Sequence, residues 1–205
     1  MDFGAIYREA FSHDDYNRHT ADEPRYVWAL QAALLQAWAV RGSGRPDDRL
    51  IWVDVGSGRG GMLRLIREAE IPTVTFSVDV EKFHDELHCV MLLLDLADPE
   101  TPAKLQRLCP QADLLVCLDV LEHLPENAIE PLLRAFATIS RRVVTSVANH
   151  PESPYGTELH LTRWSKEQWD EVFRRHFEIE DSRVEAPNPE SNPSFLYRLI
   201  RKDVP

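Results

Sequence analysis

The chain has 205 residues, of which 43% are hydrophobic, enough for one α/β domain with a sizeable core but not for a separate substrate domain. Its 23 lysines and arginines against 34 aspartates and glutamates give a formal net charge of −11, which argues against sequence-independent binding to nucleic acid or to anionic membranes. Three cysteines without C-x-x-C spacing predict buried, reduced thiols, and the chain shows neither a secretory signal nor a long apolar run, so we expect a soluble cytoplasmic protein.

The first 24 residues are polar with scattered aromatic side chains, and we interpret them as an N-terminal segment preceding a single domain of residues 25 to 205. From Pro24 onward, the run RYVWALQAALLQAWAV predicts an amphipathic helix. Glycines and a proline follow at Gly42, Gly44 and Pro46. These residues predict the end of the helix.

The stretch LIWVDVGSGRGG, residues 50 to 61, predicts a buried strand that ends in a tight glycine turn. The next run, MLRLIREAE, has apolar residues at helical spacing, so the turn stands between a strand and the start of a helix. Backbone N–H groups can meet anionic and polar ligand groups there, and glycine lets a ligand approach the main chain. Because Gly56, Gly58 and Gly61 also fit the G-x-G-x-x-G spacing of dinucleotide-binding proteins, other segments must decide the ligand.

Two further strands are predicted at TVTFSVDV and VMLLLDL, and each closes on an acid, Asp79 and Asp95 respectively. Asp79 comes about twenty residues after the glycine turn, where a carboxylate can accept hydrogen bonds from both hydroxyls of a ribose. A carboxylate suits this task because its two oxygens match a cis diol. Residues 99 to 111 then predict a short helix or loop.

The second half of the chain continues the alternation of strands and helices. ADLLVCLDV predicts a fourth strand that runs into LEHLPE, a helix with an internal proline follows, and RRVVTSVAN predicts a fifth strand. Residues 150 to 164 predict a substrate-facing loop, and Ser165 with Gln168 predicts a capping box at the start of the next helix. EIEDSRVEA and SFLYRLIRK then predict two strands joined by a proline- and asparagine-rich turn.

Two motifs carry a family resemblance. The acid two places before Gly56-x-Gly58-x-Gly60 resembles motif I of the class I S-adenosylmethionine-dependent methyltransferases, and DVLEHL at residues 119 to 124 resembles the segment after the fourth strand of many small-molecule methyltransferases. The resemblance covers about residues 25 to 202. It implies a doubly wound, mostly parallel, seven-stranded Rossmann-like sheet with a C-terminal antiparallel hairpin. It also implies that the N-terminal segment caps the site.

The same resemblance implies which residues hold S-adenosylmethionine at the carboxyl ends of the strands. Asp54 is assigned to the amino group, the backbone of Gly56, Ser57, Gly58 and Gly60 to the carboxylate end, Asp79 and Val80 to the ribose, Asp95 and Leu96 to the adenine, and Leu118 and Asp119 to the methionine moiety.

Methyl transfer from a sulfonium depends mainly on positioning the acceptor, and a base is needed only where the acceptor arrives protonated. His123 and His160 are the base candidates, with His150 behind them, and a purely structural role for His123 is the alternative. A second alternative is a metal site. Asp119, Glu122 and His123 stand at i, i+3 and i+4, so on a helical turn they share one face and could hold Mg²⁺ or Mn²⁺ together with His160.

The metal spacing resembles that of methyltransferases acting on the 3′-terminal ribose of small RNAs, and of some that methylate catechol-like quinone precursors. The first acid in those families is usually Glu, whereas this chain has Asp119. We predict methyl transfer to an oxygen or nitrogen of a small-molecule acceptor, with no membrane partner. The alternatives are a metal-assisted RNA ribose 2′-O-methyltransferase, which the acidic charge disfavours, and a non-catalytic binding protein of the same fold. The acceptor and the oligomeric state stay open.

Overall fold

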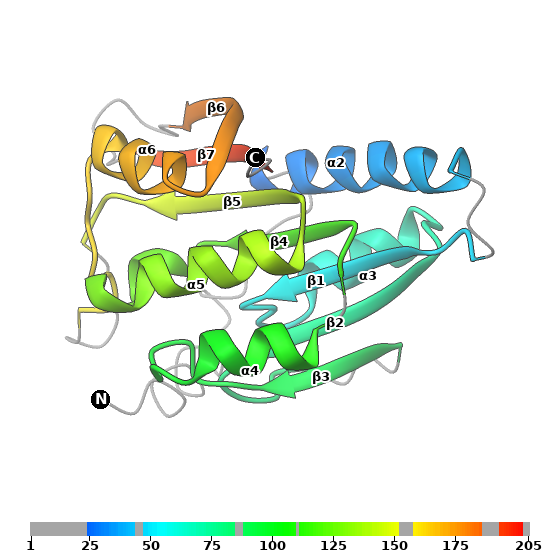
Figure 1. Ribbon diagram of the computed structural model, residues 1–205, viewed down its shortest axis with the longest axis horizontal. Helices are drawn as coiled ribbons and strands as arrows, with labels where there is room; N and C mark the ends of the chain where they lie inside the picture. The colour runs from blue at the N-terminus through cyan, green and yellow to red at the C-terminus, as the bar shows by residue number, and fades with distance from the viewer. Residues whose placement is uncertain are drawn as a thin grey trace.

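The computed structural model describes residues 24–43, 47–84, 88–109, 111–151, 158–185 and 193–202. The N-terminal cap predicted for residues 1 to 24 therefore lies, apart from Pro24, outside the described residues. Seven strands form one sheet in the order β3-β2-β1-β4-β5-β7-β6 (Figure 1). The strands are β1 Leu50–Val55, β2 Thr73–Asp79, β3 Cys89–Leu93, β4 Leu114–Leu118, β5 Arg142–Ala148, β6 Phe177–Glu185 and β7 Ser194–Arg201.

Strands β1 to β5 are parallel, whereas β7 runs antiparallel to both β5 and β6. The predicted mostly parallel sheet with an antiparallel C-terminal hairpin is confirmed. The chain builds outward from β1 through β2 to β3 and then returns to place β4 on the other side of β1. This reversal lies between β1 and β4, at whose carboxyl ends ligands bind in open α/β sheets.

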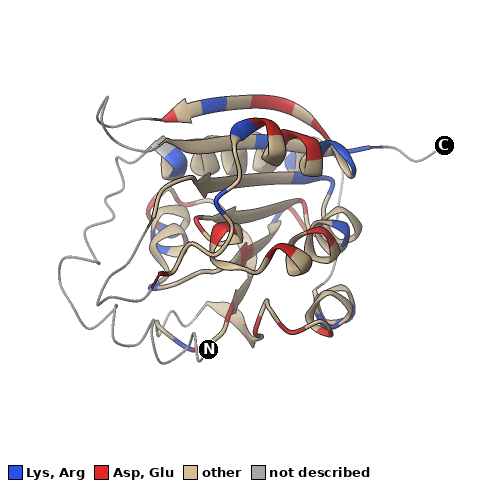
Figure 2. Ribbon diagram, turned by 90° about the vertical axis from the view of Figure 1, so that its left-hand side faces the viewer, with Lys and Arg blue, Asp and Glu red and all other residues tan. Residues whose placement is uncertain are grey.

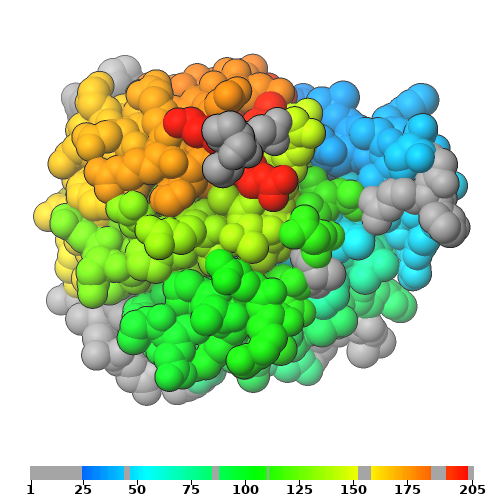
Figure 3. All heavy atoms as spheres, viewed as in Figure 1, coloured from blue at the N-terminus to red at the C-terminus, as the bar shows by residue number. Residues whose placement is uncertain are grey.

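Helices cover both faces of the sheet, and each face has its own apolar core. On one face lie α4 Thr101–Leu108, α5 Glu126–Ile139 and α6 Lys166–Arg174, whose atoms fill the view in Figure 3. The other face carries α2 Pro24–Arg41 and α3 Gly61–Glu68. Successive side chains of a strand point to opposite faces. Accordingly, Trp52 of β1 packs with α2 and α3, while Val53 joins the core under α5.

Local signals explain several element ends. The capping box of α6 is present, because the Gln168 N–H donates to the Ser165 hydroxyl and the Ser165 N–H donates to the Gln168 side chain.

Helix α2 departs from the amphipathic expectation, since Leu35 and Trp38 are 62% and 75% exposed on its outer side. Charged residues of both signs line the edge strand β6 (Figure 2), as is usual for an exposed sheet edge. In the described part of the chain, no helix is long and apolar enough to cross a membrane.

The core under α6 provides a test of this packing. Trp169 is fully buried and stacks on Phe173, with ring centroids 5.6 Å apart, whereas Trp38 is exposed on α2. We expect Trp169→Ala to lower the free energy of unfolding by about 3 to 5 kcal/mol, because it leaves a large cavity. Trp38→Ala, the matched control, should change it by less than about 1 kcal/mol. Urea unfolding of both variants measures the difference, and equal effects would contradict the assignment of Trp169 to the core.

Candidate active site

The glycine turn after β1 lies against the segment that leaves β4. Gly56, Gly58 and Gly60 all have positive φ, at 71°, 49° and 72°. A Cβ at Gly56 would come within 2.2 Å of a methyl group of Val120, so this position excludes any side chain. The N–H of Gly56 donates to the Val78 carbonyl over 2.7 Å, which ties the turn to β2 as well. The turn is thus held from both sides at the reversal point of the sheet.

Asp79, at the end of β2, holds this turn through its carboxylate. One oxygen accepts the Gly58 N–H over 2.8 Å, and the other accepts the Val80 N–H over 2.7 Å. Burial raises the pKa of Asp79 to about 6, and the two backbone N–H groups act in the opposite direction. Each carboxylate oxygen accepts up to two hydrogen bonds, so both retain acceptor capacity for a ribose. The residue predicted to bind the ribose therefore also shapes the glycine turn.

Asp54, the penultimate residue of β1, is only 4% exposed. Within the described residues, its Oδ2 atom has no hydrogen-bond partner. Burial, followed by the charge of Asp79, raises the pKa of Asp54 to about 7. A buried, unsatisfied carboxylate oxygen is costly unless a donor or cation meets it. The position thus suits the ammonium group that the sequence assigned to it.

Asp95 follows β3, beside the end of β2. The N–H of Leu94 donates to the Asp79 carbonyl over 2.8 Å, which ties this segment to β2. The side chain of Asp95 is exposed and one of its oxygens accepts the Ala97 N–H over 2.9 Å, while Leu96 is buried. Because β1, β2 and β3 are neighbours, the carboxyl ends of these strands bring Asp54, Asp79 and Asp95 to one edge of the sheet.

Asp119 leaves β4, after Leu118, with a left-handed backbone, φ 53°, which is unusual for a residue with a side chain. Its Oδ1 accepts the Ser146 hydroxyl of β5 over 2.5 Å, and its Oδ2 pairs with the Arg25 Nε of α2 over 2.9 Å. Arg25 was not singled out from the sequence, since a lone arginine at a helix start carries no motif. The neighbouring Tyr26 lies near Gly61, so the start of α2 covers the glycine turn.

A second contact set that the sequence did not indicate lies beneath the turn. The Ser77 hydroxyl of β2 donates to the Ser57 hydroxyl over 2.6 Å, and the His84 Nε2 lies 3.1 Å from the Ser77 hydroxyl. All three side chains are buried. Such a polar network rigidifies the backbone that it joins. The hydrogen bond from Ser77 to the Ser57 side chain therefore helps to fix the glycine turn on β2.

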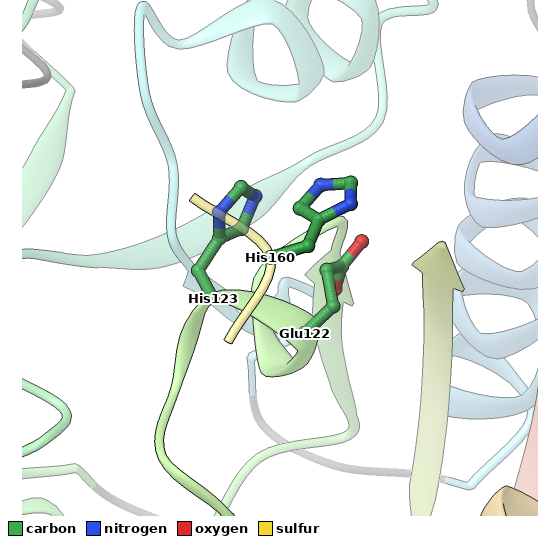
Figure 4. Close-up of side chains that lie close together, drawn as sticks. All are labelled: Glu122, His123 and His160. Atoms are coloured by element: carbon green, nitrogen blue, oxygen red, sulfur yellow. The ribbon is translucent and has the colours of Figure 1, made fainter. Parts of the chain in front are cut away.

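Glu122, His123 and His160 form a buried cluster next to Asp119. Glu122 and His123 lie on the single 3-10 turn η2 Leu121–His123, and His160 comes from the segment before α6 (Figure 4). One potential ligand atom from each residue lies within 4.8 Å of the other two, and the two imidazole centroids are 4.7 Å apart. Asp119 does not join this cluster. The structure therefore brings together three of the four residues considered for a metal.

Backbone contacts hold the members of the cluster in place. The His123 Nδ1 lies 3.2 Å from the Leu159 carbonyl and the His160 Nδ1 lies 2.6 Å from the His150 carbonyl. Because a carbonyl only accepts, each Nδ1 carries the proton, and in a neutral ring the lone pair then lies on Nε2. The ring of His150 lies beside that of His160, with centroids 4.8 Å apart.

The carboxylate of Glu122 is fully buried. Its Oε1 accepts the Ala148 N–H of β5 over 2.8 Å, whereas its Oε2 has no hydrogen-bond partner within the described residues. Burial and, after it, the charge of Asp119 raise the pKa of Glu122. The segment that carries His160 is fastened to η2, because the Thr162 N–H donates to the Glu122 carbonyl over 2.9 Å and the Thr162 hydroxyl donates to the Leu124 carbonyl over 2.7 Å.

Residues 26 to 183 match the profile of a family described as a methyltransferase domain. The chain belongs to this methyltransferase family. The family membership inferred from the glycine turn and the DVLEHL segment is thereby confirmed. No curated protein is similar enough in sequence to match the chain.

Solved structures of methyltransferases share the fold. The 1,6-didemethyltoxoflavin-N1-methyltransferase of Burkholderia thailandensis, with bound S-adenosylhomocysteine, is 16% identical with a TM-score of 0.65, over 98% of this chain and 90% of that one. The N-methyltransferase NodS of Bradyrhizobium japonicum is 12% identical with a TM-score of 0.64, over 97% and 98% of the two chains. The magnesium protoporphyrin IX methyltransferase of Synechocystis is 17% identical with a TM-score of 0.59, over 98% of each.

The raised pKa of Asp54 predicts a specific dependence of stability on pH. An unfolded Asp titrates near pH 4, about three units below the folded value, so between about pH 4 and 7 the folded state binds more protons than the unfolded state. The free energy of unfolding should therefore fall as the pH rises through this interval. Asp54→Asn removes that loss.

Urea unfolding of the wild type and of Asp54→Asn at pH 5 and pH 8 measures this effect. We expect the stability of the variant relative to the wild type to rise between the two pH values, on the order of 2 kcal/mol. Asp79 titrates in both proteins, so its contribution largely cancels in the comparison. A difference that stays constant with pH would show that Asp54 is ionised throughout.

Proposed function

We propose that this methyltransferase transfers a methyl group from S-adenosylmethionine to an oxygen or nitrogen of a small-molecule acceptor. The observation that carries the proposal is the buried Oδ2 of Asp54, which has no hydrogen-bond partner among the described residues and lies beside the glycine turn that Asp79 binds through the Gly58 N–H. An ammonium group and a ribose diol are the complements of these two carboxylates. When bound, S-adenosylmethionine supplies a methyl group activated by the positive charge on sulfur.

The arrangement of the turn changes how its glycines serve the cofactor. The N–H groups of Gly56, Gly58 and Gly60 all donate to protein oxygens, namely those of Val78, Asp79 and Ser57. We therefore assign to the glycines the close approach of the cofactor to the main chain. Arg25, whose guanidinium pairs with Asp119 after the end of β4, provides a cation for the carboxylate end. We assign the adenine to the carboxylate of Asp95 and to the backbone N–H of Leu96.

His123 and His160 activate the acceptor in this proposal. An acceptor that arrives protonated must lose its proton as the methyl group is transferred. The two imidazoles present Nε2 lone pairs in a buried cluster that begins at Glu122, three residues after Asp119, which we assign to the methionine moiety of the cofactor. Small-molecule acceptors are named for two of the three structural neighbours, and the net charge of −11 disfavours an RNA backbone as the acceptor.

Calorimetry with S-adenosylmethionine tests the cofactor assignment. Asp79→Asn should weaken binding by about 2 to 3 kcal/mol, because it removes charge-assisted hydrogen bonds to the ribose. The matched control is Asp113→Asn, since Asp113 accepts the Ile51 N–H over 2.8 Å near the opposite ends of β1 and β4 and should leave the affinity unchanged. Binding of NAD without binding of S-adenosylmethionine would overturn the proposed function.

The acceptor side is tested by transfer of a labelled methyl group to pools of small metabolites. His160→Ala should slow transfer to the acceptor so identified by about 10²- to 10⁴-fold, the usual contribution of a group that handles a proton in the transition state. The dissociation constant for S-adenosylmethionine should stay within a factor of two or so of the wild type. His176→Ala, which changes a partly buried histidine beside Glu130, is the control. Full activity of His160→Ala would remove His160 from the reaction.

A further inference from the structure

The Glu122–His123–His160 cluster directs two imidazoles and one carboxylate toward a common point. The three potential ligand atoms lie within 4.8 Å of one another (Figure 4). One ion bound at about 2.0 to 2.2 Å from each needs them no more than about 4.4 Å apart, so binding would draw the side chains slightly closer together. We propose that this cluster binds a divalent first-row transition-metal ion. The inference deepens the proposed function and rests on it: with the ion bound, the two histidines activate the acceptor as ligands of the ion, and their Nε2 lone pairs no longer take its proton.

Both histidines are oriented as metal ligands usually are. Histidines that bind metal donate their second ring N–H to a carbonyl or carboxylate, which fixes both the tautomer and the ring. His123 does so to the Leu159 carbonyl and His160 to the His150 carbonyl. The protein thereby fixes the Nε2 lone pairs as the ligating atoms.

Glu122 provides the negative charge that such a site needs. Its Oε1 is held by the Ala148 N–H, and its Oε2 is buried without a hydrogen-bond partner in the described part of the chain. A carboxylate with 0% exposure and an unsatisfied oxygen is unfavourable by several kcal/mol unless it meets a cation or takes up a proton. A divalent ion shared with the two imidazoles satisfies this oxygen.

The donor set selects the class of ion. Imidazole nitrogens favour ions such as Fe²⁺, Co²⁺, Ni²⁺ and Zn²⁺ over Mg²⁺, Ca²⁺ and Mn²⁺, which prefer oxygen ligands. Asp119 does not complete the set, because its two oxygens already contact Ser146 and Arg25. Three protein ligands leave coordination positions open for a substrate oxygen, as in catalytic metal sites.

This composition favours a hydroxyl acceptor over an amine. A divalent ion lowers the pKa of an oxygen that it binds, so an acceptor hydroxyl would release its proton to water before methyl transfer. The oxygen then forms the new bond to the methyl carbon as the carbon–sulfur bond breaks. The bonding pair of that bond stays on sulfur, so the sulfonium becomes a neutral thioether and no oxidant or reductant is required.

Cobalt titration of the chelator-treated, full-length protein tests the site without an activity assay. Co²⁺ bound by nitrogen and oxygen ligands gives visible absorption bands, and calorimetry gives the stoichiometry and affinity. We expect one Co²⁺ per chain. Glu122→Gln and His160→Ala should each weaken binding more than about 100-fold, beyond the 10- to 100-fold loss typical of an outer partner. His176→Ala should bind Co²⁺ as the wild type does.

These measurements distinguish a failure of the metal proposal from a failure of the proposed function. Absence of saturable Co²⁺ binding up to millimolar concentration, or binding that survives both substitutions, overturns the metal site. Retention of S-adenosylmethionine binding and of the unfolding midpoint in Glu122→Gln shows that its loss of Co²⁺ is not a loss of fold. Methyl transfer that persists after exhaustive chelation leaves the proposed function intact and rejects the ion, whereas failure to bind S-adenosylmethionine rejects the function itself.

Discussion

The contact between Gly56 and Val120 is the constraint on which the site depends. It joins the exit of β1 to the exit of β4, the two strands between which the chain reverses direction across the sheet. A side chain at position 56 would have to displace Val120, and Val120 connects Asp119 to the turn that carries Glu122 and His123. Gly56 therefore links the site proposed for the cofactor to the histidine cluster proposed for the acceptor. Methyl transfer depends mainly on the relative positions of donor and acceptor, and this close packing would hold them in place.

Two carboxylates near this contact are buried, and each has an oxygen without a hydrogen-bond partner in the described part of the chain. They are Asp54, at the site proposed for the cofactor, and Glu122, in the histidine cluster. Each raises the free energy of the folded protein and has a raised pKa, because burial disfavours its charged form. Ligands that bring positive charge relieve this unfavourable burial, so part of the binding free energy comes from the protein's own desolvated acids. Functional sites often contain groups whose pKa is shifted in this way, and such groups lower the stability of the folded protein.

Motifs with a fixed spacing could be read from the sequence, and contacts set by tertiary packing could not. The Gly56-x-Gly58-x-Gly60 turn and the family resemblance that it carries predicted the sheet, and Asp79 falls at the predicted strand end. The spacing of Asp119, Glu122 and His123 suggested one helical face. However, the chain leaves β4 with a left-handed residue and only then begins a short 3-10 turn, so Asp119 points to Arg25 instead. The exposure of Trp38 could not be predicted from the sequence either. Helix α2 has apolar residues on both sides, so the sequence does not show which side packs against the sheet.

Backbone hydrogen bonds fix the relative positions of the three side chains of the cluster. His160 lies 37 positions after His123, and a separation of this length would normally leave their relative placement loose. Here the Thr162 N–H and hydroxyl bond to the carbonyls of Glu122 and Leu124, so the segment that carries His160 is fixed to the turn that carries its partners. Imidazoles held in this way need little reorganisation when an acceptor or an ion arrives. Preorganisation of the acceptor side thus comes from main-chain hydrogen bonds between η2 and the segment before α6, and it does not require a ligand to assemble it.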